Sequence, residues 1–240
     1  MLQVATRPSH TERAPLPGWL RQVLVVYRKD LAIEAATGEV TVTSGFFALL
    51  VVVLASLSYF GGPVSARSVA SGTIWISLSF AAVLSLGKSW QRERDEAALD
   101  GLLVSPLSRS AIFAGKALSV WTFLLAVLVV VLPLSLLLSS IDAAMLGPLS
   151  LVALVATPGV AASGTLFGAM TVRTGARDLL LAVVLFPLLA PMLLAAVAVT
   201  RELFNGVPLS ELLDYLKLMG VFDVVFIAGG LSMFGTLVER

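Results

Sequence analysis

The residues best suited to a chemical task are the charged side chains of the segment 88–113, which contains the run QRERDEAALDGLL. Acids and bases are mixed in this run, and leucines recur beside them at helical spacing. Mixed signs favour contact with another protein, because an interface selects complementary charges whereas membrane anchoring needs only cations. An ordinary solvated helix face is the alternative interpretation. The residues expected to contact a partner are Arg92, Glu93, Arg94, Glu96, Leu99, Asp100, Leu102 and Leu103.

Catalytic and metal-ligating groups are scarce in the chain. The single histidine, His10, lies in a polar N-terminal tail, and there is no cysteine. These counts exclude thiol chemistry and argue against a Ser/His/Asp triad or an imidazole ligand for haem iron or zinc inside a span. No GxxxxGK[ST] phosphate loop occurs, so ATP binding by that motif is excluded. The sequence predicts no catalytic residue, no metal site and no cofactor bound by this chain alone, and hence no enzyme.

The chain that must position these charges has the composition of a membrane protein. Its 240 residues are 58% hydrophobic and 13% charged, and its mean hydropathy is +0.98. A helix needs roughly 20 apolar residues to cross a bilayer, and the alternation of a transmembrane barrel is absent. The sequence predicts one all-α transmembrane domain over residues 1–240, with six spans at about 42–60, 68–87, 114–138, 149–170, 179–200 and 218–238.

The distribution of Lys and Arg predicts the orientation of these spans. With a cytoplasmic N-terminus, thirteen of the sixteen basic residues lie inside, and only Arg67, Arg201 and Lys217 lie outside. The positive-inside rule therefore places both termini in the cytoplasm. We expect a polar tail over residues 1–18 that is not a signal peptide, an interfacial helix over 19–36 and a cytoplasmic coupling loop over 88–113.

The helix expected before the first span is amphipathic. Leu20, Leu24, Tyr27 and Leu31 fall on one stripe, and two arginines lie beside it. This pattern suits a helix in the headgroup region, with its cations near anionic lipid. A simple lead-in to the first span and a contact surface for a partner are equally compatible with it. Within the coupling loop, Ser105 and Pro106 indicate either a helix stop or the cap and first residue of the next helix.

Prolines and small residues lie inside the predicted spans. Proline removes a backbone donor and tends to bend a helix, which neighbouring groups in a membrane can compensate. Gly164 and Gly168 form a small-xxx-small face, which indicates close packing either within the chain or between subunits. The residues expected to act as hinges or packing surfaces are Pro158, Gly159, Gly164, Gly168, Pro187 and Pro191.

Asp223 is the one ionisable residue well inside a predicted span. Its burial costs roughly 2.5–3.5 kcal/mol on insertion scales. We therefore expect it to face a cavity, to find a hydrogen-bond donor, or to reach toward the interface near Lys217. A lone acid argues against a proton-coupled carrier, which uses a relay of such groups.

Together these features resemble the permease half of an ABC-2 type exporter and, more narrowly, the CcmB (haem exporter protein B) family of bacterial cytochrome c maturation. The resemblance runs from about Arg28 to the end of the chain. The N-terminal tail is longer than in the family, and the outer segment 201–220 has no counterpart that aligns. The residues that carry the resemblance lie at 94–96, 100–108, 115–116, 156–159, 173–177 and 186–191.

The resemblance implies a permease subunit in the bacterial cytoplasmic (inner) membrane. Its partners would be a CcmA-like ABC ATPase that binds ATP and Mg²⁺, CcmC- and CcmD-like membrane subunits, and a periplasmic haem chaperone. A two-fold ATPase further implies a homodimer of this chain. ATP hydrolysis would drive either haem delivery, with haem as the candidate cargo, or release of the loaded chaperone. The lack of histidine in the spans favours release.

Two other classes of protein fit the residues. An ABC-2 type permease for a lipid, a glycan or a drug shares the same physical features and differs only in cargo. An ATP-independent carrier or scaffold fits less well, because buried charge is nearly absent and no inverted repeat is evident. The net charge of +1 gives no indication of a nucleic-acid partner.

Overall fold

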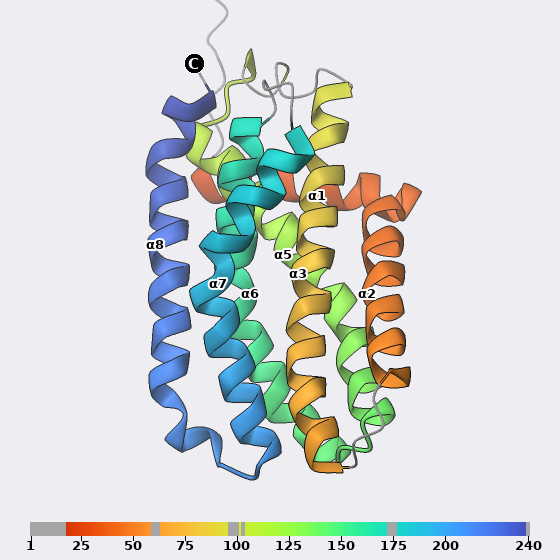
Figure 1. Ribbon diagram of the computed structural model, residues 1–240. Coiled ribbons are helices and arrows are strands. Elements are labelled where there is room, and N and C mark those ends of the chain that lie inside the picture. Colours follow the sequence, from red (N-terminus) through yellow and green to blue (C-terminus); the bar gives the residue numbers. More distant parts are fainter. Residues whose placement is uncertain (1–17, 59–62, 96–100, 102–103, 172–176, 239–240) are drawn as a thin grey trace, which may run out of the picture.

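The computed structural model is all-helical over the residues that it describes (Figure 1). These are all residues except 1–17, 59–62, 96–100, 102–103, 172–176 and 239–240; for 63–65, 94–95, 171 and 177–182 only the backbone is described. The helices are α1 (Trp19–Thr37), α2 (Glu39–Leu57), α3 (Pro63–Asp95), α5 (Arg109–Leu138), α6 (Leu146–Thr171), α7 (Arg177–Phe204) and α8 (Leu213–Val238), with the short 3-10 turns η1 (Ala143–Met145) and η2 (Leu209–Glu211).

Six helices of the described chain are long and apolar enough to cross a membrane, which confirms the predicted number of spans. Each expected span overlaps one of them. Within the expected coupling loop 88–113, α3 continues to Asp95 and α5 begins at Arg109. The spanning segments are Glu39–Leu57, Ala66–Glu93, Arg109–Leu138, Ala143–Met170, Val183–Phe204 and Leu213–Val238.

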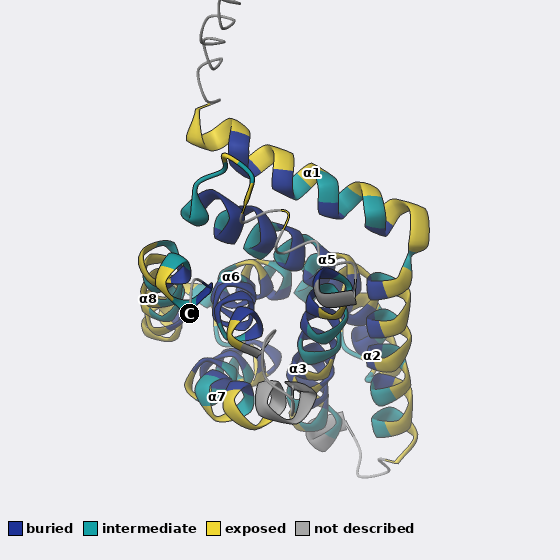
Figure 2. Ribbon diagram, turned by 90° about the horizontal axis from the view of Figure 1, so that it is seen from above, coloured by how far each residue is buried: buried dark blue, intermediate teal, exposed yellow. Residues whose placement is uncertain are grey.

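The spanning helices form a bundle with its largest apolar core among α3, α5, α6 and α7. Helix α2 packs on one side of this group, against α3 and α5, and α8 packs on the other, mainly against α6 (Figure 2). Helix α1 lies crosswise against the side of the bundle, beside α5 and near one end, and the C-terminal end of α8 is at that same end (Figures 1 and 2). The α1 end of the bundle is therefore distinct from the opposite end.

Helix α1 packs on the bundle through a polar face. Its buried residues are Gln22, Val23, Val26, Asp30 and Glu34. Successive helical residues are about 100° apart, so this face differs from the predicted leucine stripe. Two members of that stripe, Leu20 and Leu24, are 71% and 46% exposed. A helix with a polar side toward protein and an apolar side away from it suits an interfacial position.

Hydrogen bonds between side chains join the spanning helices inside the bundle. Trp75 Nε1 of α3 donates to Thr200 Oγ1 of α7 over 2.9 Å, and Trp121 Nε1 of α5 donates to Thr157 Oγ1 of α6 over 2.9 Å. The hydroxyls of Ser44 and Ser85 lie 2.8 Å apart between α2 and α3. Such bonds hold helices together where lipid removes the hydrophobic drive for association.

The predicted small-residue face of α6 packs within the chain. A Cβ atom at Gly164 would meet the side chain of Leu86, and one at Gly168 would meet the indole of Trp90, both on α3. Gly115 of α5 likewise faces Val26 of α1. Glycine is required at these positions because the helices approach too closely for any side chain.

The prolines lie within continuous helices. Pro133 is inside α5, Pro158 is inside α6, and Pro187 and Pro191 are inside α7. The two prolines of α7 share its exposed side, whereas Leu189 between them is in the core. The α7 prolines therefore face away from the packed interior.

Asp223 of α8 has a backbone partner in α6. Its Oδ1 accepts a hydrogen bond of 2.7 Å from the amide of Gly159, the residue that follows Pro158. A Cβ atom at Gly159 would collide with this carboxylate. Of the expected alternatives for Asp223, the structure supplies the hydrogen-bond donor, and the absence of a side chain at Gly159 makes the approach possible.

Replacing Gly168 by alanine tests the packing of α6 on α3. The new methyl group must displace the buried Trp90 ring, so Gly168→Ala is expected to destabilise the fold by about 1–3 kcal/mol. Gly220→Ala inside α8 meets open space and is expected to be neutral or to stabilise by up to about 1 kcal/mol. Unfolding of the purified chain in micelles, followed by circular dichroism, measures both; equal stabilities would contradict the packing described.

The contact between α6 and α8 is tested by two substitutions of Asp223. Asparagine keeps an acceptor oxygen for the Gly159 amide, so Asp223→Asn is expected to retain stability. Asp223→Leu leaves this donor without its partner, which costs about 1–3 kcal/mol. The same unfolding experiment measures the difference. If asparagine is as damaging as leucine, the charge of Asp223 matters rather than its hydrogen bond.

Candidate functional site

The structure divides the residues that the sequence predicted for partner contact. Arg92 and Glu93 lie on the last turns of α3, and Arg94 is described only by its backbone. The remaining residues, Glu96, Leu99, Asp100, Leu102 and Leu103, lie outside the described residues. Glu93 was expected on an accessible face, but its side chain is only 4% exposed. It belongs to an internal cluster of charges instead.

This ion network consists of Lys29 and Asp30 of α1, Glu93 of α3 and Lys116 of α5. Glu93 Oε1 accepts hydrogen bonds from both lysines, over 2.6 Å from Lys29 Nζ and 2.6 Å from Lys116 Nζ. Asp30 Oδ2 lies 3.4 Å from Lys116 Nζ, and Asp30 Oδ1 lies 3.2 Å from Lys29 Nζ. Two cations and two anions therefore meet where three helices converge.

Burial makes Lys116 the centre of the ion network. Its side chain is 2% exposed, and its ammonium lies 5.1 Å from the centre of the Trp90 ring. A buried ammonium without counter-charges would be too costly to keep, whereas two carboxylates and an aromatic face compensate it. Glu93 and Asp30 together therefore supply the counter-charges for the buried Lys116 side chain.

Lys29 lies at the edge of the ion network and is more exposed than Lys116. Burial lowers the pKa of Lys29, but the adjacent carboxylates of Asp30 and Glu93 outweigh this effect and raise the pKa above the ordinary 10.5. A lysine with a raised pKa stabilises the folded chain below its unfolded pKa and loses that effect as the pH rises through the folded value. Its contribution is therefore complete at neutral pH.

The polar face of α1 also accepts hydrogen bonds from backbone amides at the N-termini of two spanning helices. Gln22 Oε1 accepts a hydrogen bond of 2.8 Å from the amide of Ser108, which is the N-cap of α5. Glu34 accepts hydrogen bonds of 3.2 and 2.7 Å from the amides of Val40 and Thr41 in the first turn of α2. A carboxylate at a helix N-terminus satisfies free backbone donors and complements the helix dipole.

The N-cap of α5 distinguishes between the two interpretations of Ser105 and Pro106. Ser108, and not Ser105, accepts the amide of Ala111 with its side chain. The amide of Ser105 instead bonds the carbonyl of Gly101 over 3.1 Å, as at the end of a helical turn. Of the two interpretations of Ser105 and Pro106, the helix stop is therefore correct.

A second group of charges on α3 lies at the surface, in contrast to the buried ion network. Lys88 Nζ lies 2.8 Å from Glu39 Oε1, and Arg92 lies 3.4 Å from Glu39 Oε2. The side chains of Lys88 and Glu39 are 36% and 48% exposed. Exposed pairs of this kind contribute little to stability. They join α2 to α3 at the surface.

Sequence reasoning did not identify Lys29, Asp30, Glu34 or Lys116 as members of a site. One signal was present, because Gln22, Val26, Asp30 and Glu34 recur at every fourth position of α1. Such spacing marks one face of a helix, and acids on the face opposite to the arginines indicate a buried polar contact. The partners on α3 and α5 are far away in the sequence, so spacing alone could not supply them.

No group of three or more His, Cys, Asp or Glu in the described part of the chain is placed to hold a metal ion. Two apolar grooves lie on the bundle, one of about 350 Å³ between α5 and α6 and one of about 290 Å³ beside Trp19, Trp121 and Pro158. Their lining residues include no His, Cys, Met or Tyr. The grooves therefore offer no side chain of the types that ligate haem iron.

Comparison with known proteins agrees with the resemblance predicted from the sequence. The family described as CcmB protein matches residues 21–235. Heme exporter protein B of Rhodobacter capsulatus is 32% identical over 155 residues, which cover 63% of this chain and 71% of that protein. The Pseudomonas aeruginosa protein of the same name is 28% identical over 144 residues, with 60% and 65% covered, and that of Haemophilus influenzae is 26% identical over 200 residues, with 82% and 90% covered. Because the family match extends over most of its length, the chain belongs to the CcmB family.

Proposed function

We propose that this chain is the permease subunit of an ABC-type membrane complex that serves cytochrome c-type biogenesis. A separate CcmA-like ATPase hydrolyses ATP, and the segment between α3 and α5 couples that hydrolysis to haem delivery or to release of a haem-loaded chaperone. Membership of the CcmB family and the name shared by the three relatives support haem rather than a lipid, glycan or drug as the cargo. The six apolar helices suit a multi-pass subunit.

The distribution of basic residues supports an orientation with the α1 end in the cytoplasm, and membership of the CcmB family supports a location in the bacterial inner membrane. Arg67, Arg201 and Lys217 lie near the starts of α3 and α8 and the end of α7, away from α1. The basic residues of α1, the end of α3 and the start of α5 lie at the other end. The positive-inside rule orients such a molecule with α1 and the segment 96–108 toward a cytoplasmic ATPase.

The observation that carries the proposal is the position of the ion network beside this segment. Glu93 is two residues before the end of α3, and Lys116 is two turns inside α5. Both flanks of the segment are therefore attached to each other and to Asp30 of α1 by buried charges. A displacement of the segment would move α1, α3 and α5 together. Separation of the paired side chains would leave a buried charge without its partner, at a cost of about 3–5 kcal/mol.

The same structure favours chaperone release over passage of haem through this chain. The apolar grooves contain no residue suited to ligate haem iron, and Asp223 is already bonded to Gly159. On this proposal the haem-binding groups belong to CcmC- and CcmD-like subunits and to the periplasmic chaperone. Two copies of this chain would match the two-fold symmetry of an ATPase dimer.

Substitution of the predicted partner-contact leucines tests ATPase docking. An aspartate at either position disrupts an apolar contact, so Leu102→Asp and Leu103→Asp are each expected to abolish co-purification of the ATPase from native membranes. Insertion of the chain should be unchanged, because the segment is outside the spans. Ser210→Asp is the matched control, since it adds the same charge to an exposed residue at the opposite end. Full recovery of the ATPase with both leucine variants would refute docking at this segment.

A double-mutant cycle between Glu93 and Lys116 tests the coupling role of the ion network. Glu93→Gln and Lys116→Met each leave a buried charge without its partner, and each is expected to lower the free energy of unfolding by about 3 kcal/mol. The double variant is expected to lower it by clearly less than the sum of the two. Lys88→Met removes a pair of similar length at the surface and is expected to cost less than about 1 kcal/mol. Unfolding in micelles measures all four variants.

The same variants separate coupling from docking in cells. Glu93→Gln is expected to retain the ATPase in a pull-down and yet to lower the yield of holocytochrome c, read by haem staining. Lys88→Met should leave both unchanged. A Glu93→Gln chain that inserts normally and matures cytochrome c at the normal level would show that the ion network only stabilises the fold.

A further inference from the structure

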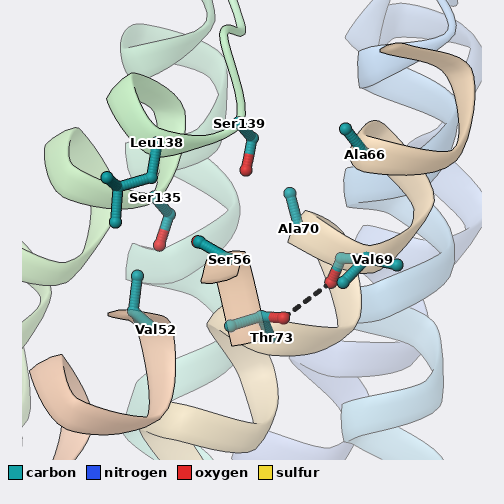
Figure 3. Close-up of a pocket in the computed structure, with 9 residues that line it drawn as sticks. All are labelled: Val52, Ser56, Ala66, Val69, Ala70, Thr73, Ser135, Leu138 and Ser139. Carbon is teal, nitrogen blue, oxygen red and sulfur yellow. Dashed lines mark hydrogen bonds between the residues drawn. The ribbon is translucent and has the colours of Figure 1, made fainter. Parts of the chain in front are cut away.

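A small polar cavity lies between α2, α3 and α5 near the end of the bundle opposite α1. Its volume is about 60 Å³, and its lining includes four residues that carry hydroxyl groups, Ser56, Thr73, Ser135 and Ser139. Val52, Ala66, Val69, Ala70 and Leu138 complete the wall (Figure 3). It lies beside a small apolar cluster of the same three helices, which includes Ala48, Val127 and Val131.

Ser135 is the residue that marks this cavity as a binding site. Its side chain is 2% exposed, and its Oγ has no hydrogen-bond partner within the described protein. Several other buried hydroxyls on these helices donate to the carbonyl four residues earlier, as Ser119 does to Gly115 and Thr73 to Val69, whereas Ser77 of α3 has no partner within the described residues either. Ser135 does not follow this pattern, and Figure 3 shows its hydroxyl directed into the cavity together with that of Ser139.

We propose that this cavity is an internal hydration site, in which ordered water bonds the Ser135 hydroxyl and bridges it to the hydroxyls around it. A buried hydroxyl without a partner is costly, and water in a polar cavity is the usual compensation. A water molecule needs about 10–15 Å³ of such volume and two to four polar partners. The volume suffices for a small cluster of water, the hydroxyls of Ser135 and Ser139 offer two polar partners, and Thr73 Oγ1, which donates to Val69, can still accept a hydrogen bond.

Alternatives to water fit this cavity less well. The lining contains no charged side chain, so nothing compensates an ion. An acyl chain would leave Ser135 unpaired and would not fit the small volume. The cavity also lies near the end of the α5 span, because Ser135 is three residues before Leu138, the last residue of that helix. Water therefore has only a short distance to travel from the surface.

The absence of native cysteine allows a direct test with a single thiol. Ser135→Cys in the full-length chain, purified in lipid nanodiscs, introduces one S–H group whose infrared stretching band is separate from other protein bands. Transfer to D₂O converts S–H to S–D where water is present. Ser77→Cys is the matched control, because Ser77 Oγ is also buried and unpartnered but does not line this cavity.

The thiol at position 135 is expected to exchange at least about tenfold faster than the thiol at position 77, as hydrated and dry sites differ in protection. Exchange at position 135 as slow as at position 77 would overturn the proposal. Thr73→Cys probes the same cavity from α3 and decides the question if Ser135→Cys does not fold. Slow exchange there, in a chain that folds, would equally exclude water from the cavity.

Discussion

The arrangement of the α1 end depends on compensating one buried charge, the ammonium of Lys116. Moving an isolated ammonium from water into a protein interior costs far more than the net stability of a fold. Two carboxylates from different helices, Glu93 of α3 and Asp30 of α1, supply the compensation, and Trp90 supplies an aromatic face. Helix α1 is consequently an essential part of the bundle, because its removal would leave Lys116 with half of its counter-charge.

This constraint gives the two groups of charges on α3 different roles. Lys88 and Arg92 meet Glu39 at the surface, where solvent screens the pairs and side chains exchange partners readily. Glu93 lies between them and the segment 96–108, but it faces inward. The surface pairs are therefore weak, whereas separation of the buried partners would leave a charge without compensation.

The parts of the fold that depend on local composition could be predicted from the sequence. Long apolar stretches determined the six spans, and the glycines of α6 indicated close packing, although the choice of Leu86 and Trp90 as partners required the structure. The ion network could not be predicted in this way, because Asp30, Glu93 and Lys116 are far apart in the chain. Glu93 was misplaced for the same reason: in a run of mixed charges, only tertiary packing decides which one is buried.

The surroundings of Asp223 bear on the source of energy for the molecule. A carrier driven by protons uses intramembrane acids that can lose and regain their partners. The carboxylate of Asp223 is instead held by a backbone amide, at a position where Gly159 allows close contact and Pro158 has already interrupted the hydrogen-bond ladder of α6. An acid that completes the bonding of a neighbouring helix has a structural use in its present state. Its hydrogen bond to Gly159 therefore argues against a proton relay at this position.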